Sequence, residues 1–186
     1  MSILPPIGHS ERLIVVVGPS GCGKDSVLRH WRAHWPPGRV HLARRTITRS
    51  ADAHEPHESV SDEDFAQLAR ASEFATAWQA NGLRYGVRRH ELRGLADGAW
   101  VVLNGSREHL PSLRRQAPRL HVVEITASHE TLAHRLRARA REDADAVARR
   151  LERRIDTAAD LLLRNEGSLD EAAGALQRWW VALADR

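Results

Sequence analysis

Residues 13–26 read LIVVVGPSGCGKDS, and the expected architecture of the chain can be worked out from them. A short β-branched run over residues 12–17 has the composition of a buried parallel strand. A glycine-rich turn follows, and residues 25–35 then carry apolar side chains at helical spacing until Pro36 ends the helix. Between this strand and this helix lies the pattern Gly-x-x-x-x-Gly-Lys, which is typical of a phosphate-binding loop.

Each part of this loop has a physical reason. Glycines let successive backbone N–H groups turn inward around phosphate oxygens, and the following helix directs its positive end at the same anion. Lys24 is the only lysine in a chain whose other basic residues are arginines, and a compact ammonium can follow the β- and γ-phosphates of a nucleotide. The predicted nucleotide site consists of the loop residues Gly18, Pro19, Ser20, Gly21, Cys22, Gly23, Lys24, Asp25 and Ser26.

Asp25 departs from the usual motif, which has Ser or Thr at this position with a hydroxyl that reaches Mg²⁺. A carboxylate oxygen is an equally hard ligand, so the metal candidates are Asp25 and Ser26. The alternative is that Asp25 only caps the N-terminus of the helix. Cys22 is interpreted as a small residue that fills the loop and not as a nucleophile, because no base is fixed beside it.

Strands and helices alternate along the rest of the chain. Further strands are expected at residues 39–43, 99–104 and 120–126, and further helices at residues 107–116, 129–141, 145–164 and 168–184. This alternation predicts an α/β fold of three layers, in which helices cover both faces of a mostly parallel central sheet. Ligands of such sheets bind beyond the carboxyl ends of the strands, where the phosphate-binding loop falls.

Composition excludes several classes of protein. The chain is 42% hydrophobic and 28% charged, which is ordinary for a globular domain, and its longest apolar run near the start is too short to span a bilayer. Residues 1–12 lack a signal pattern, and with the single cysteine they favour a cytoplasmic protein. The net charge is only +4, and the basic clusters are interleaved with acids and lack aromatic residues, so we expect neither nucleic-acid nor membrane binding.

Several segments resemble those of the guanylate-kinase-like P-loop kinases, in the same order: GPSGxGK, Thr48-Arg49, the block from Phe74 to Tyr85-Gly86, the arginines of residues 135–151, and Arg164-Asn165. The resemblance covers about residues 12–180. It implies ATP and Mg²⁺ as cofactors. It also implies one domain over residues 1–186, with a core at about 12–45 and 99–186, an acceptor-binding insert at about 46–90 and a mobile lid at about 139–146.

The acids that read guanine in guanylate kinases are replaced here. That family has a glutamate two residues after the Phe of its FxE block, whereas Phe74 is followed by Ala75 and Thr76. Ser106 matches the position of the second acid, and Asp52 replaces a phosphate-binding arginine. A site without these acceptors should lose much of its discrimination for guanine.

The segments GPSGxGKDS, TITRxADAH, WQANGLxYG and LNGSR are similar to those of one branch of kinases, the ribose 1,5-bisphosphate phosphokinases. This resemblance includes Asp25. It implies ATP-dependent phosphoryl transfer to the 1-phosphate of ribose 1,5-bisphosphate, giving 5-phosphoribosyl 1-diphosphate in phosphonate metabolism. The binding partners are then ATP and a sugar bisphosphate. The resemblance does not fix the oligomeric state, and a homodimer is one of the alternatives.

The resemblance also assigns roles to single residues. Lys24 and the lid arginines Arg139 and Arg150 would stabilise the transferred phosphate. The acceptor would be held by Arg49 and Tyr85 at its phosphate and by Asn104 and Arg107 near its sugar, and Asn165 would line the adenine site. Two other functions remain: a nucleoside monophosphate kinase with guanylate kinase activity, and a non-catalytic interaction module. Such modules typically lose the loop lysine and the lid arginines, which this chain retains.

Overall fold

The computed structural model describes residues 5–50, 57–138 and 155–185. Its strands are β1 Leu13–Val17, β2 Val40–Leu42, β3 Arg45–Ile47, β4 Glu58–Ser59, β5 Phe74–Ala80, β6 Leu83–Arg88, β7 Trp100–Asn104, β8 His121–Thr126 and β9 Leu161–Arg164. Its α-helices are α1 Lys24–Arg32, α2 Asp62–Arg70, α3 Leu110–Gln116, α4 His129–Ala138 and α6 Leu169–Ala184, and its 3-10 helices are η1 Ser10–Arg12 and η2 Arg89–Leu95. None of the described helices is both long and apolar enough to cross a membrane.

The predicted α/β fold with a parallel central sheet is confirmed. The strand order of this sheet is β2-β7-β1-β8-β9, and β2 pairs in parallel with β7 while β8 pairs in parallel with β9. Strands β1 and β7 are buried along their whole length, as expected of strands in a sheet covered on both faces. The chain divides into two compact units, residues 1–15 with 36–121 and residues 16–35 with 122–186, each of which is described by itself.

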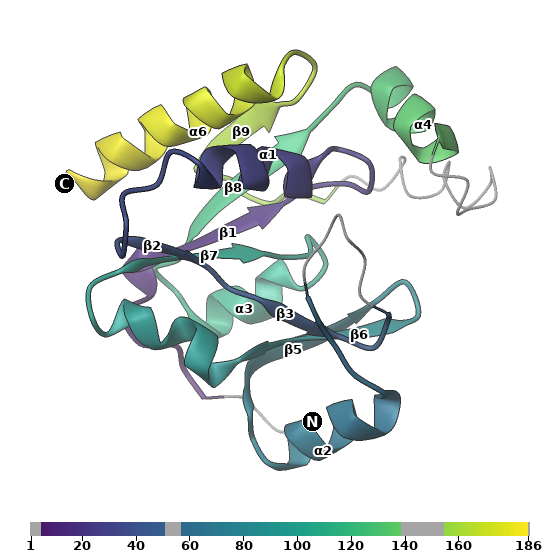
Figure 1. The fold of residues 1–186 in the computed structure, drawn as a ribbon, viewed down its shortest axis with the longest axis vertical. Coiled ribbons are helices and arrows are strands. Elements are labelled where there is room, and N and C mark those ends of the chain that lie inside the picture. Colours follow the sequence, from purple (N-terminus) through teal and green to yellow (C-terminus); the bar gives the residue numbers. More distant parts are fainter. Residues whose placement is uncertain (1–4, 51–56, 139–154, 186) are drawn as a thin grey trace. The chain divides into compact units, whose positions relative to one another are not determined.

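The first unit contains a second sheet, of order β4-β3-β6-β5, whose strands lie between residues 45 and 88 (Figure 1). Its longest ladder joins β5 and β6 in antiparallel register, with Trp78 opposite Tyr85. The turn between them is Asn81-Gly82, and both residues have positive φ, of 54° and 74°. An Asn-Gly pair of this kind is the strongest short-range signal of a β-hairpin, and the hairpin could have been predicted from it.

The second unit packs α1 along α6 (Figure 1), and Trp31 Nε1 donates a hydrogen bond to Gln177 Oε1 at 2.8 Å. Helix α6 begins with the expected capping box, in which Ser168 and Glu171 satisfy one another's backbone N–H groups. The expected helix over residues 145–164 is wrong at its end, because residues 161–164 form strand β9. Asp160 accepts a hydrogen bond from the Val122 N–H and places Leu161 opposite Val123 in the parallel ladder.

Gly86 in β6 allows the ring of Phe74 to lie close to the backbone of this strand. A Cβ at this position would collide with the ring of Phe74, which is 2% exposed and stacks on Phe65 with centroids 4.5 Å apart. Because the ring is buried and packed on Phe65, it has little room to move, and we expect Gly86→Ala to lower the free energy of unfolding by about 1–3 kcal/mol in urea denaturation. The control is Gly94→Ala, where the new methyl group meets Ala99 Cβ at an acceptable 3.4 Å. Equal stability of the two variants would contradict the prediction.

Candidate functional site

The phosphate-binding loop joins β1 to α1 in the predicted place, and α1 begins at Lys24 directly after it. Lys24 Nζ donates a hydrogen bond to the carbonyl oxygen of Gly18 at 2.9 Å and lies 3.5 Å from the carbonyl oxygen of Pro19. Cys22 Sγ lies 3.9 Å from the same ammonium, and the Cys22 side chain is fully buried, as expected of a residue that fills the loop. These partners carry no full charge, so the ammonium keeps its charge available for a phosphate.

Asp25 and Ser26 lie in the first turn of α1, and the N-cap residue is Gly23, without a side-chain cap. The carboxylate of Asp25 therefore does not occupy the cap position, although an acid in the first turn interacts favourably with the positive end of the helix. A carboxylate followed by a hydroxyl supplies two oxygen donors, which suits Mg²⁺ because this ion takes one or two ligands from the protein and the rest from phosphates and water. Within the described residues, no group of three or more His, Cys, Asp or Glu side chains could hold a metal by itself.

Asn165 links the phosphate-binding loop to the end of strand β9. It follows β9 directly, it is 2% exposed, and its Nδ2 donates a hydrogen bond to the carbonyl oxygen of Cys22 at 2.8 Å. Arg135 of α4 donates a hydrogen bond to the backbone oxygen of Asn165 at 3.2 Å. Asn165 is the residue predicted for the adenine site. Arg135 is not among the predicted site residues, although it opens the Arg-Leu-x-x-Arg motif on which the resemblance rests.

Asn165 and Arg135 each keep one polar atom without a hydrogen bond. Asn165 Oδ1 and Arg135 Nη1 are buried and have no partner among the described residues. Both side chains border Gly23, since a Cβ built there would lie 2.5 Å from Asn165 Nδ2 and 3.7 Å from Arg135 Nη1. A buried acceptor and a buried cationic donor without partners are costly unless a ligand completes them. The pair fits a nucleotide, whose adenine amino group can donate and whose phosphates can accept.

The predicted acceptor residues lie in the first unit. Tyr85 stacks on Trp78 with ring centroids 5.4 Å apart, and the Arg45 guanidinium lies 5.9 Å from the centre of the Tyr85 ring. Arg45 also donates a hydrogen bond to the backbone oxygen of Asn104 at 3.3 Å. Arg45 thus brings Tyr85 and Asn104 together, and no motif of the sequence had singled it out.

For the remaining predicted site residues, all of them arginines, the structure gives fewer contacts or none. The backbone oxygen of Arg49 accepts a hydrogen bond from Ser59 Oγ at 2.7 Å, which fixes the chain just after β3. Arg107 lies in the loop between Asn104 and α3 and is half-buried. Arg139, Arg150 and the whole predicted lid lie outside the described residues.

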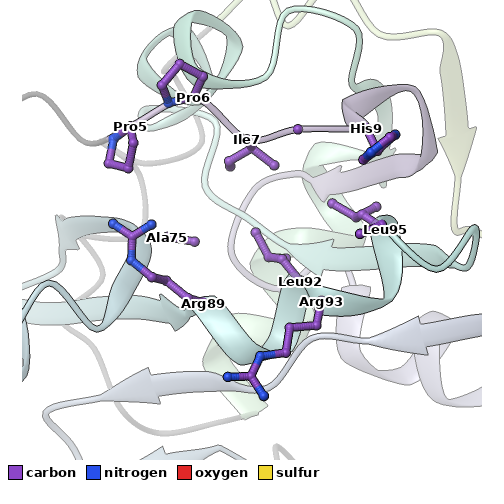
Figure 2. A pocket seen from close by; sticks show the side chains of 11 residues that line it. Pro5, Pro6, Ile7, His9, Ala75, Arg89, Leu92, Arg93 and Leu95 are labelled. Atoms are coloured by element: carbon purple, nitrogen blue, oxygen red, sulfur yellow. The ribbon is translucent and has the colours of Figure 1, made fainter.

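A separate hollow of about 210 Å³ lies in the first unit and contains none of the predicted site residues (Figure 2). Its apolar wall comes from Ile7, Leu92 and Leu95, and its arginines are Arg89 and Arg93. Both arginines are exposed, and none of the described residues that line the hollow aims a buried polar side chain into it.

Gly23, at the end of the phosphate-binding loop, lies directly against the side chain of Asn165. Its φ is +84°, a value that favours glycine, and an added methyl group would press on Asn165 Nδ2. We expect Gly23→Ala to weaken MgATP binding at least about tenfold in titration calorimetry, because the phosphate nest and its tie to Asn165 are disturbed together. Gly174→Ala on α6 is the control, since it meets only the end of the Arg178 side chain at 3.4 Å. Unchanged MgATP affinity in folded Gly23→Ala protein would count against the loop as the phosphate site.

Residues 13–161 match the family described as AAA domain. A solved guanylate kinase from Anaplasma phagocytophilum superposes with a TM-score of 0.71 at 19% identity, covering 94% of this chain and 86% of that one. At this identity the similarity shows the fold alone.

Curated relatives are more similar in sequence. The ribose 1,5-bisphosphate phosphokinase PhnN of Burkholderia pseudomallei (strain K96243) is 42% identical over 172 residues, which cover 90% of this chain and 94% of the relative. The enzyme of the same name from Agrobacterium fabrum (strain C58 / ATCC 33970) is also 42% identical, with coverage of 89% and 94%. A bifunctional ribose 1,5-bisphosphokinase-thymidine phosphorylase from Cupriavidus pinatubonensis is 42% identical over 87% of this chain, which is 28% of that protein. The chain belongs to the ribose 1,5-bisphosphate phosphokinase family.

Proposed function

We propose that the protein transfers the γ-phosphoryl group of ATP to the 1-phosphate of ribose 1,5-bisphosphate, giving 5-phosphoribosyl 1-diphosphate and ADP. Relatives that carry this name match nearly the whole length of the chain. The observation that carries the proposal is the Lys24 ammonium, held at the phosphate-binding loop by the Gly18 carbonyl and not paired with any acid in the part of the chain that the structure describes. A phosphotransferase needs a lysine at this position to bind the transferred phosphate, whereas a non-catalytic binding module can lose it.

In this proposal the second unit holds the donor. The loop from Gly18 to Ser26 binds the phosphates of ATP through backbone N–H groups and Lys24. Asn165 and Arg135 supply a buried acceptor and a buried donor that border the loop and have no hydrogen-bond partner among the described residues. Asp25 and Ser26 are the residues that would hold Mg²⁺, which supplies positive charge to the phosphates when bound.

The acceptor chemistry requires no general base. A phosphate monoester has a second pKa near 6, so the 1-phosphate is largely ionised at pH 7. One of its oxygens attacks the γ-phosphorus, the bond to the β–γ bridging oxygen breaks, and ADP leaves with that electron pair. Positioning and positive charge therefore do most of the catalytic work. The residues proposed for it are Lys24, Arg139 and Arg150 on the migrating group, and Arg49, Tyr85, Asn104 and Arg107 on the acceptor.

Neither alternative has a specific observation in its favour. A guanylate kinase would need an acid at the position of Thr76, which is fully buried and hydrogen-bonded within the protein. A non-catalytic module would have no use for the loop lysine. Since ATP and sugar phosphates are charged metabolites that do not cross membranes, the proposed activity also places the protein in the cytoplasm.

The proposed activity is tested by a product assay. The protein is incubated with MgATP and either ribose 1,5-bisphosphate or GMP, and the diphosphate products are separated by anion-exchange chromatography. We expect the sugar bisphosphate to be phosphorylated, and Lys24→Met to lower kcat by about 10²-fold or more because a charge is lost from the transition state. Arg29→Met, which removes an exposed charge from the same helix, serves as the control. Exclusive phosphorylation of GMP, or normal turnover by Lys24→Met, would overturn the proposal.

The metal role of Asp25 has a test of its own. We expect Asp25→Ala to raise the Mg²⁺ concentration for half-maximal activity by about tenfold, because one hard oxygen donor is lost. Asp25→Ser restores the hydroxyl of the common motif and should recover most of the Mg²⁺ dependence. If Asp25→Ala titrates with Mg²⁺ as the wild type does, Asp25 acts only on the helix terminus.

A further inference from the structure

Thr76 is hydrogen-bonded inside the protein in a way that leaves its hydroxyl no further proton to offer. It lies in β5 with 0% of its surface exposed, at the position where the guanylate-kinase resemblance places a guanine-reading acid. Its Oγ1 lies 2.7 Å from His109 Nε2 and 3.0 Å from Gln116 Oε1. Both partners come from more than thirty residues further along the chain.

The directions of these hydrogen bonds follow from the atoms available. Gln116 Nε2 donates to the carbonyl oxygen of Ala75 at 3.4 Å, so Gln116 Oε1 is the acceptor that faces Thr76. The single hydroxyl proton of Thr76 goes to Gln116, and Thr76 must then accept the N–H of His109 Nε2. Burial, reinforced by the charge of Arg115, lowers the pKa of His109 to about 4, so the ring is neutral at pH 7 with its proton on Nε2.

The ring of His109 is also stacked. Its centroid lies 4.9 Å from that of Trp78, and the two planes are 14° apart. Trp78 in turn stacks on Tyr85 at 5.4 Å and 9°, so the rings of His109, Trp78 and Tyr85 are nearly parallel. His109 is the N-cap residue of α3 but makes no side-chain cap bond, which leaves its ring for Thr76 and Trp78.

A protein recognises a nucleobase by stacking it on an aromatic face and by hydrogen bonds to its edge. The imidazole of His109, which corresponds to the five-membered ring of a purine, already makes both kinds of contact, on Trp78 and with Thr76. We propose that His109 is a specificity-determining residue, whose ring fills the place of a nucleobase in the acceptor site, so that the accepted substrate is a sugar phosphate without a base. This inference rests on the proposed function, because it concerns the choice of acceptor in that reaction.

The test compares His109→Ala with the wild type for binding and phosphorylation of GMP. Removing the imidazole exposes the face of Trp78 and leaves Thr76 Oγ1 without its hydrogen bond from His109. Stacking of one base on an aromatic side chain is worth about 1–3 kcal/mol, so we expect the Kd for GMP in titration calorimetry to fall about tenfold or more. The ratio of kcat/KM for GMP to that for ribose 1,5-bisphosphate should rise by a similar factor. Free imidazole, which can refill the vacated place, should weaken GMP binding again, an effect that a purely structural role of His109 would not produce.

The matched control is His121→Ala. His121 is also a half-buried histidine of the first unit, with its ring 6.0 Å from that of Trp100 and Nε2 hydrogen-bonded to a backbone oxygen, and we expect no change in GMP binding. If His109→Ala does not fold, His109→Gln retains a donor toward Thr76 but uncovers Trp78, and a gain in GMP binding is expected from it as well. An unchanged Kd for GMP in the folded variant, or an equal gain in His121→Ala, would overturn the inference. Failure of the wild type to phosphorylate ribose 1,5-bisphosphate would overturn the proposed function instead, and the GMP titrations would still decide the role of His109.

Discussion

The phosphate-binding loop depends on one buried hydrogen bond, from Asn165 Nδ2 to the carbonyl oxygen of Cys22 (2.8 Å). A glycine-rich loop is entropically costly to order, and its N–H groups can surround a phosphate only if the backbone is held in one conformation. Asn165 provides that restraint from the far end of the sequence, directly after β9. Gly23 leaves the space that lets the amide come so close, and Arg135 holds the backbone of Asn165 in turn. The local motif and the distant asparagine are therefore one structural unit.

Lysine and arginine take different tasks in this chain. The single lysine lies at the loop, where its compact ammonium is held by backbone oxygens and is paired with no carboxylate of the described residues. Arginine acts where a planar, forked donor is useful, as in Arg45, which reaches the backbone of Asn104 and the face of Tyr85 at once. Most of the arginines thus reflect the overall composition of the chain. Two of them make specific contacts: Arg45 with Tyr85 and Asn104, and Arg135 with the backbone of Asn165.

The sequence was sufficient for features that are local. Strand β1, the loop and helix α1 were predictable because their signals lie within about twenty residues, and the capping box of α6 within four. Strand β9 was not, since Leu161–Leu163 is a short apolar run that suits a helix as well as a strand, and only pairing with β8 decides between them. The network around Thr76 was beyond reach for the same reason: Thr76 and His109 are 33 residues apart, and no motif links them.

At Thr76, where the guanylate-kinase resemblance leads one to expect a guanine-reading acid, the neutral ring of His109 is hydrogen-bonded to the hydroxyl. A carboxylate there would accept the N–H groups of a base and attract it, whereas a neutral imidazole bound to Thr76 fills the space without offering that charge. Its pKa of about 4 lies well below neutrality, because the buried ring would lose hydration on protonation and because Arg115 repels a second positive charge. Across the physiological range the ring therefore keeps the same protons and the same hydrogen-bond directions. Exclusion of a base by His109 should consequently be independent of pH, unlike recognition by a group that titrates near 7.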